Sequence, residues 1–586
     1  MFAQQTTAGS PRSGHRRGAG SRPRMTLASV VLIEMILASG IVVWAIIGTT
    51  WGASVMAVAA VVSMSIVPVG DGGSVAARAG RRLSYRWTRL RRRAAETAPA
   101  PFDIPIATRD RARFTGRPAE TIGARWDGRT LVTVLRVDPG EEVPTFLTPA
   151  GAQPAVAAGQ SVPIDVLAEC ISPYDIRLSS VEIISHGLRT RGYGPVTATY
   201  QRTLGPLPAT AQRSVFVVIR LDPLDCPDAV ARRGGGATGA LRTATIATRR
   251  VAKRLAEHGL RVAILAAADI TAVDTFLLDG ASVGTAAEQW DSVTLGGLRM
   301  RSAAIDPGAL TTALDTVWSH PSASTTVTIR LRRNDNDDLE ISGLVRFTDV
   351  DGRTPPPSWP PALRPLDGRQ FDALTRSLPV ATSPRVDRTI GSLTGSRATT
   401  VAGSLCVPAA GCGQLIGADR TGRAVALRLA GPGVPSVMVA ADLPLLIQVV
   451  LRSVAVGISV VIHTDRPNRW ASTISVVGDP GALALSTDRA RPRGPVIMAV
   501  VDGSPRPPAT PGVTVLTAVA PGTGPDRLTG DAVLLLRQNP RAPQDISVMT
   551  TTAEYGVTMV ATPDEWRLIA PAERSVTDNV TAPIRL

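Results

Sequence analysis

The sequence predicts an α/β protein in which an N-terminal two-helix transmembrane hairpin precedes two mixed α/β cytoplasmic domains. Two apolar runs near the N-terminus predict the hairpin, and strands that alternate with helices predict the α/β layers. A proline-rich stretch after residue 350 divides the remainder of the chain, and 586 residues are too many for a single domain.

The two apolar runs are residues 27–47 and 51–69, separated only by Gly48, Thr49 and Thr50. Each run is close to the ~20 apolar residues that a helix needs to cross a bilayer. Three connecting residues allow only a tight hairpin, which brings both ends of the chain to one side of the membrane. A buried helical hairpin of a soluble domain fits less well, because residues 27–47 have no polar face and one charged residue, Glu34.

Glu34 lies about one third of the way into the first run, where a carboxylate is costly unless it faces water or a polar partner. One interpretation is a contact with another membrane subunit, or an ion path. The other is a side chain that reaches the hydrated cytoplasmic leaflet.

Arginines flank the hairpin on both sides, and arginine beside a span is retained in the cytoplasm. Both termini and residues 70–586 are therefore predicted on the cytoplasmic side of the inner (cytoplasmic) membrane. We expect a disordered basic tail at 1–25, the hairpin at 26–70, and a basic juxtamembrane segment and linker at 71–118. The flanking arginines are Arg12, Arg16, Arg17, Arg22, Arg24, Arg78, Arg81, Arg82, Arg86, Arg89, Arg91, Arg92 and Arg93.

The net charge of +15 is concentrated beside the hairpin. The first 100 residues contain 13 arginines and three acidic residues, whereas the other 486 residues have a net charge of only +5. Cations next to a span attract anionic lipid headgroups, at about 1 kcal/mol each. The charge thus predicts contact with a lipid bilayer with anionic headgroups, and it requires no nucleic-acid partner.

The first cytoplasmic domain is predicted at 119–350. Residues 121–125 and 130–137 form a β-hairpin, with Asp127 and Gly128 in the turn. A long helix at 240–258 has apolar residues on one face and arginines mainly on the other, and Gly259 ends it. The other expected elements are a helix at 161–170, strands at 181–185, 213–221 and 261–266, a helix at 270–278, and strands at 325–332 and 339–347.

Residues 351–397 predict a stiff proline-rich linker that lies outside any core, since residues 355–361 read PPPSWPP. The second domain is predicted at 398–586. Its compact βαβ unit comprises a strand at 437–440, a helix at 443–456 and a strand at 459–463. Further strands are expected near 473–477, 496–501, 513–518, 532–537 and 546–551.

Two segments carry residues suited to phosphate or metal, but the sequence favours a structural role for both. The glycine-rich segment 232–239 precedes a helix, as anion-binding loops do, yet it matches neither common nucleotide-binding spacing. Asp335 and Asp337 have the DxD spacing of metal-dependent sugar transferases. They lie between two strong strands, where Asn and Asp are the usual turn residues.

His463 ends a predicted strand, where α/β sheets often place their sites, but no GxSxG nucleophile motif accompanies it. All four cysteines (Cys170, Cys226, Cys406 and Cys412) are expected to be free thiols, and no histidine completes a zinc set with Cys406 and Cys412. The sequence therefore predicts that the protein is not an enzyme, with no catalytic, cofactor-binding or metal-binding residue and no cofactor. This favours a scaffold or interaction role.

Several short segments, taken in order, resemble the EccE family, a membrane component of the mycobacterial type VII (ESX) secretion system. No single segment is specific, but the ordered set is, over about 25–350 and 398–480. After the basic-flanked hairpin the segments are 122–128 (IGARWDG), 131–137 (LVTVLRV), 164–168 (IDVLA), 175–176 (DI), 185–189 (SHGLR), 204–208 (LGPLP), 219–223 (IRLDP), 231–235 (ARRGG), 411–419 (GCGQLIGAD) and 463–467 (HTDRP) with Trp470.

The resemblance implies a non-enzymatic structural subunit of the type VII secretion membrane complex in an actinobacterium. The implied partners are an FtsK/SpoIIIE-like ATPase, a polytopic channel-like subunit, a periplasmic-domain subunit and the mycosin protease. ATP hydrolysis by this chain is not implied, and its sequence contains no P-loop. The alternative is a membrane-tethered nucleotide-sugar-dependent transferase that uses Asp335 and Asp337.

Overall fold

The structure, a computed structural model, describes residues 27–67, 79–86 and 99–569 with gaps. The gaps are 48, 81, 84, 105–120, 150, 155–160, 193, 351–357, 381–386, 388, 489–491, 493–495, 524, 526, 529 and 530. The predicted tail at 1–25 and most of the predicted juxtamembrane segment lie outside the described residues. The chain divides into two compact units, Met1–Arg93 and Ala94–Leu586.

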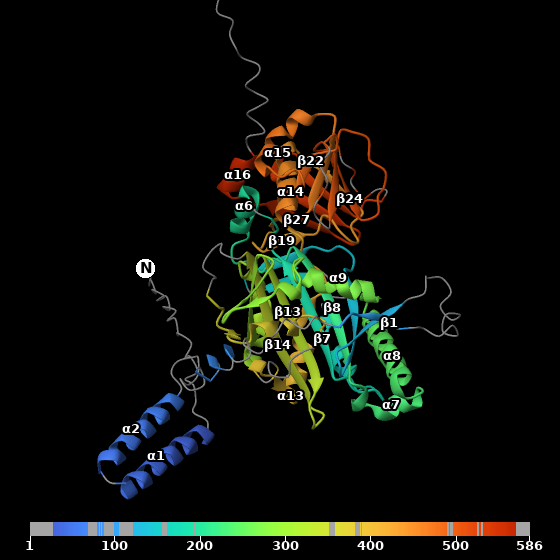
Figure 1. Cartoon of the computed structure of the whole chain (residues 1–586). Coiled ribbons are helices and arrows are strands. Elements are labelled where there is room, and N and C mark those ends of the chain that lie inside the picture. Colours follow the sequence, from blue (N-terminus) through green and yellow to red (C-terminus); the bar gives the residue numbers. More distant parts are fainter. Residues whose placement is uncertain are drawn as a thin grey trace, which may run out of the picture. The chain divides into compact units, whose positions relative to one another are not determined.

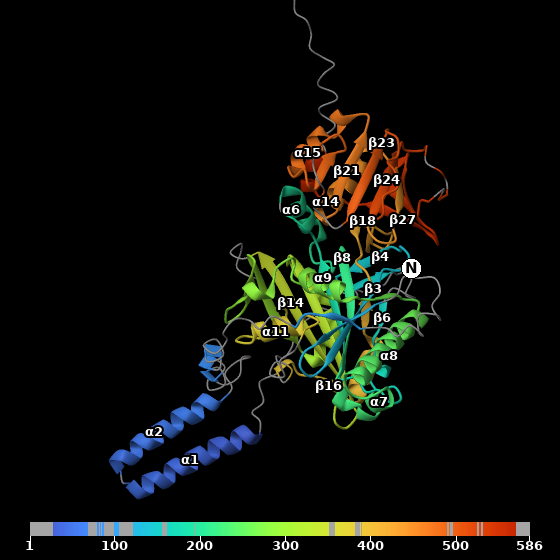
Figure 2. The same ribbon diagram turned by 45° about the vertical axis from the view of Figure 1, so that its right-hand side comes forward.

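The first unit contains two helices that lie side by side, α1 (Leu27–Ile47) and α2 (Thr49–Ile66) (Figures 1 and 2). Gly40 lets them approach closely, since a Cβ there would lie 3.0 Å from Met56 Sδ and 3.1 Å from Ala59 Cβ. Glu34 is exposed on α1. Among the residues that the structure describes, none of the helices combines enough length and apolarity for a membrane crossing. The two apolar runs are helices, as predicted, and their insertion in a membrane stays a prediction.

The second unit contains two large sheets, and mixed α/β architecture is confirmed. The first sheet has 13 strands, all paired antiparallel, with the main order β1-β2-β3-β8-β7-β13-β14-β12-β11-β10. The strands are β1 (Phe102–Ile104), β2 (Ile122–Trp126), β3 (Leu131–Asp138), β7 (Ser180–Leu188), β8 (Gln212–Leu221), β9 (Arg261–Ile264), β10 (Ala287–Glu288), β11 (Val293–Leu295), β12 (Leu298–Ile305), β13 (Ser324–Arg333), β14 (Leu339–Val350), β15 (Leu363–Pro365) and β16 (Leu393–Thr394).

Both faces of this sheet are covered, which explains why its central strands are apolar almost throughout. On β3, Leu131 and Leu135 face one core with α8 (Gly236–Glu257), whereas Val132 and Val134 face the other core with α9 (Ala267–Leu277). The shorter helices are α5 (Ile164–Glu169), α7 (Pro227–Arg232), α10 (Leu310–Thr316), α11 (Gln370–Arg376) and α13 (Ser396–Ser404).

The second sheet has 12 strands in the order β22-β21-β23-β24-β20-β25-β26-β27-β18-β19-β4-β5. The pairs from β22 to β25 are parallel and those from β25 to β5 are antiparallel. The strands are β4 (Thr145–Thr148), β5 (Gly151–Pro154), β18 (Gln414–Ala418), β19 (Ala424–Leu427), β20 (Ser436–Ala440), β21 (Ser459–Thr464), β22 (Leu483–Leu485), β23 (Ile497–Asp502), β24 (Val513–Val519), β25 (Leu534–Asn539), β26 (Ala542–Thr550) and β27 (Glu554–Met559).

Four helices gather beside this sheet: α6 (Pro195–Leu204), α14 (Leu443–Ala455), α15 (Ala471–Val477) and α16 (Pro563–Ile569) (Figure 1). Of these, α6 comes from the chain before 350, and so do β4 and β5. A small two-stranded sheet also pairs β6 (Ser161–Pro163) with β17 (Cys406–Pro408). The domain bounds 119–350 and 398–586 therefore stay a prediction. The elements α6, β4, β5 and β6 come from the first predicted domain but pack or pair with elements of the second.

Two local expectations are wrong. The segment expected as a strand near 473–477 is helix α15, because the chain turns at Pro467 and Trp470, whose side chain is fully buried, and Gly478 ends the helix with φ +64°. Part of the expected linker is a core element, since Leu363–Pro365 pairs with β12 as β15 and Leu363 and Leu366 are buried. Burial of the apolar residues that follow the proline run thus stabilises this segment within the core, although the prolines themselves favour an extended linker.

Candidate functional site

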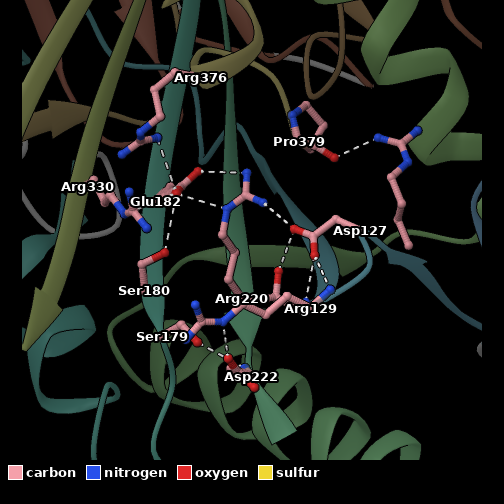
Figure 3. A network of polar contacts seen from close by, with 12 residues as sticks. Asp127, Arg129, Ser179, Ser180, Glu182, Arg220, Asp222, Arg330, Arg376 and Pro379 are labelled. Carbon is pink, nitrogen blue, oxygen red and sulfur yellow. Dashed lines mark hydrogen bonds and ion pairs between the residues drawn. The ribbon is translucent and has the colours of Figure 1, made fainter. Parts of the chain in front are cut away.

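A network of buried charges runs through the middle of the first sheet, around Glu182 on β7 (Figure 3). Arg220, on the neighbouring strand β8, donates from Nε to Glu182 Oε1 at 2.9 Å and from Nη2 to Oε2 at 3.3 Å. Arg376 Nη1 lies 3.2 Å and Arg330 Nε 3.5 Å from Oε1. The Ser180 hydroxyl donates to the same oxygen at 3.3 Å. One carboxylate therefore holds three arginines from β8, β13 and α11.

The carboxylate of Asp387 offsets part of the positive charge of this cluster. Asp387 accepts from Arg330 Nη1 at 2.6 Å and from Arg376 Nε at 3.0 Å. On the other side, Arg220 Nη1 lies 3.8 Å from Asp127 Oδ2, in the turn between β2 and β3. Three carboxylates thus face three guanidinium groups, so the network carries no net charge.

The arginines decide the ionisation of Glu182. Burial acts to raise the pKa of this carboxyl, but the charges of Arg220, Arg376 and Arg330 outweigh burial and lower its pKa to about 2. The carboxylate therefore stays ionised at neutral pH. Its side chain is fully buried and bonded on every side, so this arrangement fixes strands and α11 together rather than presenting a reactive group.

A second set of contacts joins the two sheets, and we call it the seam: residues 204–213 against residues 411–416. The backbone N–H of Cys412 donates to Thr210 O at 2.8 Å and that of Gly413 to Ala211 O at 3.0 Å. Gly411 is required there, because a Cβ would lie 2.3 Å from Ala211 O. Segment 411–419, which carries part of the family resemblance, therefore contacts the residues that directly follow segment 204–208.

Arg189 and Tyr200 strengthen the seam. Arg189 donates to Leu207 O and Gly205 O at 2.9 Å each and to Trp318 O at 3.0 Å, and burial lowers its pKa. The Tyr200 hydroxyl on α6 accepts from the N–H of Leu415 at 2.8 Å. A third segment of the resemblance, 185–189, is thus held in the same place.

A buried ion pair ties α14 to α16. Arg452 donates from Nε to Glu565 Oε1 at 2.6 Å and from Nη2 to Oε2 at 2.8 Å, and both side chains are buried. The same guanidinium donates to the carbonyls of Leu415 at 2.7 Å and Val560 at 2.5 Å. Arg452 thereby connects the last helix of the described chain to the middle of the sheet.

Asp335 and Asp337 lie where the sequence placed them, at the tip of the hairpin between β13 and β14. The Asn334 carboxamide oxygen accepts from the N–H of Asn336 at 3.0 Å and of Asp338 at 2.9 Å, as a turn residue does. Asp337 has φ +61° and lies 3.5 Å from Arg333. Within the described residues, no group of three or more His, Cys, Asp or Glu side chains is placed to hold a metal ion.

The remaining candidates are separate from one another. Gly234 and Gly235, between α7 and α8, and Gly236, the first residue of α8, all have positive φ, and the adjacent Arg233 donates to Asp175 at 2.8 Å. His463 is half-buried beside a cavity of about 270 Å³, and burial lowers its pKa. All four cysteines are free thiols, and only Cys406 is exposed. The structure brings none of these residues together.

Sequence reasoning missed Glu182, its three arginines and the Arg452–Glu565 pair. The network around Glu182 could have been found from charged residues of opposite sign inside apolar strands. These are Glu182 within SVEIISHGL, Arg220 within QRSVFVVIRL and Arg330 within STTVTIRLRR. A charge in such a strand needs a partner, because an unpaired buried charge is very costly.

Comparison with known proteins agrees with the resemblance. Residues 209–305, which include β8 and α8, match the family described as "Putative type VII ESX secretion system translocon, EccE". The ESX-1 secretion system protein EccE1 of Mycobacterium tuberculosis is 28% identical over 189 residues, which cover 31% of this chain and 38% of that protein.

Two further relatives extend the match. The ESX-2 secretion system protein EccE2 of Mycobacterium tuberculosis is 26% identical over 370 residues, 60% of this chain and 64% of that protein. EccE1 of Mycolicibacterium smegmatis is 27% identical over 157 residues, 26% of this chain and 33% of that protein. The chain therefore spans between about one third and two thirds of the length of these curated relatives.

Proposed function

We propose that this chain, a member of the EccE family of the mycobacterial ESX systems, is a non-enzymatic structural subunit of a type VII secretion membrane complex. The observation that carries the proposal is the family match, together with relatives named as ESX secretion system proteins. The partners we propose are the other membrane components: the FtsK/SpoIIIE-like ATPase, the polytopic channel-like subunit, the periplasmic-domain subunit and the mycosin protease.

We further propose that the helical hairpin anchors the chain in the inner membrane, with two spans and both termini cytoplasmic. Large apolar side chains are exposed on both helices, among them Ile46 at 77% and Trp51 at 73%. Such surface is unfavourable in water by roughly 25 cal/mol per Å² and is accommodated in lipid. The arginines on both flanks favour the cytoplasmic orientation.

Placing charge on the exposed face of α2 tests the anchor. Val58→Arg with Val61→Arg should move much of the chain from the carbonate-washed membrane fraction to the supernatant, since arginine near a span centre costs roughly 2.5–3.5 kcal/mol. Both valines are exposed. Val560→Arg, at an exposed valine of the second unit, is the matched control and should leave the distribution unchanged. Equal retention of the Val58/Val61 variant would contradict the anchor.

Complementation tests the subunit role and the absence of catalysis together. Deleting the gene should abolish export through one ESX system, and the wild-type chain should restore it. The double variant Asp335→Ala/Asp337→Ala should restore export equally, because these side chains form only a hairpin tip. Export that survives the deletion would contradict the subunit role, and failure of the double variant at normal protein level would favour the transferase alternative.

A further inference from the structure

We propose that the outer face of α8, together with the loops before β7 and after β8, binds the surface of an anionic phospholipid bilayer. This surface consists of Tyr174, Leu224, Arg232, Arg242, Arg250 and Lys253, and we call it the basic face. This inference rests on the proposed membrane anchor, because the hairpin would keep the second unit near the anionic leaflet.

Two exposed apolar side chains belong to the basic face. Tyr174 is 95% exposed in the loop before β7, and Leu224 is 81% exposed in the 3₁₀ turn η2 (Pro223–Asp225) after β8. Ser180 at the start of β7 pairs with Arg220 near the end of β8, so both loops leave the sheet at the same end. The Ser179 hydroxyl ties them, donating to Asp225 Oδ2 at 3.0 Å.

The backbone of Tyr174 is strained, with φ +59°, a region that bulky residues adopt at a cost of about 1–2 kcal/mol. The ring gains no burial from this conformation, since Tyr174 is 95% exposed. Arg250 lies over the ring, with Cζ 5.3 Å from its centroid, and donates to Pro173 O at 3.1 Å. Strain that displays an aromatic side chain to solvent points to a binding role.

Cations lie beside these apolar tips. The helix α8, which packs on one face of the sheet, carries Arg242, Arg249, Arg250, Lys253 and Arg254 against one acidic residue, Glu257, and Figure 1 shows it above α7. Arg242 and Lys253 are exposed, and Ile246 adds exposed apolar surface between them. Arg232, at the end of α7, is also largely exposed and lies 3.4 Å from Asp175.

This combination fits a lipid surface better than an acidic peptide. Tyr174 and Leu224 protrude as separate tips, whereas a peptide would need a groove to receive it. The cations extend along a helix of 22 residues, which matches an array of phosphates rather than a single charged group. Tyrosine at a bilayer interface and arginine or lysine at phosphate are the usual contacts of such surfaces.

Hydrogen exchange on the full-length chain tests the proposal, in nanodiscs of phosphatidylcholine alone or with one third phosphatidylglycerol. Peptides covering 172–179 and 222–235 should exchange more slowly in the anionic discs and at equal rates in the neutral ones. Arg242→Glu with Lys253→Glu should remove the difference, since each cation contributes on the order of fivefold to binding.

Tyr174→Gly separates binding from folding. Glycine suits φ +59°, so this variant should unfold no more easily than wild type and still lose most of the anionic-lipid protection. Trp566→Ala, which removes an exposed aromatic side chain on α16, is the control and should retain the anionic-lipid protection. Equal exchange in both discs, or protection that appears only with added partner proteins, would overturn the proposal. A chain that enters neither disc would instead contradict the membrane anchor.

Discussion

Glu182→Gln should lower the free energy of unfolding of the second unit by about 3–5 kcal/mol, the cost of removing one partner from a buried ion-pair network. The substitution preserves shape but leaves Arg220 and Arg376 facing a neutral amide, and both arginines are buried. Urea unfolding at pH 7 measures the change. The matched control is Glu257→Gln, whose exposed pairs with Lys253 and Arg254 should contribute less than about 1 kcal/mol.

The pH dependence of this effect follows from the pKa of Glu182, which is about 2 in the folded chain against an ordinary value of 4.5. A depressed carboxyl pKa stabilises the fold above pH ~4.5 and loses that contribution as the pH falls towards 2. The difference between wild type and Glu182→Gln should therefore be constant from pH 5 to 7 and shrink below pH 4.5. A difference that grows on acidification would contradict the network.

Arg452→Met should have a comparable effect, about 3–5 kcal/mol, because it leaves Glu565 buried without its partner. It also removes donors from the carbonyls of Leu415 and Val560, so α16 should detach before the sheet unfolds. Limited proteolysis after residue 560 and urea unfolding would measure the two consequences. Arg567→Met, at an exposed pair with Asp564, is the control and should change neither. An intact α16 in Arg452→Met would contradict this account.

Elements fixed by neighbouring residues could be predicted from the sequence. The hairpin of β2 and β3 forms as expected because Asp127 accepts from the N–H of Thr130 at 2.6 Å and Gly128 adopts φ +93°. Helix α8 and strand β8 were also placed within a few residues, since their apolar patterns are long and regular.

The contacts that join distant parts could not be predicted in this way. Arg452 and Glu565 are 113 residues apart, and Arg376 lies in a segment whose prolines favoured an extended linker. The short strands β4 and β5 join the second sheet only because β4 pairs with β19, which lies more than 250 residues later in the chain. Local patterns do not encode which distant strand or charge completes them, so the charge network and the seam appear only in the folded chain.

The most direct test of the central claim is the size and composition of the particle that contains this chain in native membranes. A tagged copy would be extracted in mild detergent, separated on a native gel and identified by mass spectrometry of the band. The account predicts a very large complex that also contains the FtsK/SpoIIIE-like ATPase and the polytopic subunit. A small species without these partners, from membranes in which the other components do co-migrate, would contradict the proposal that the chain is a structural subunit.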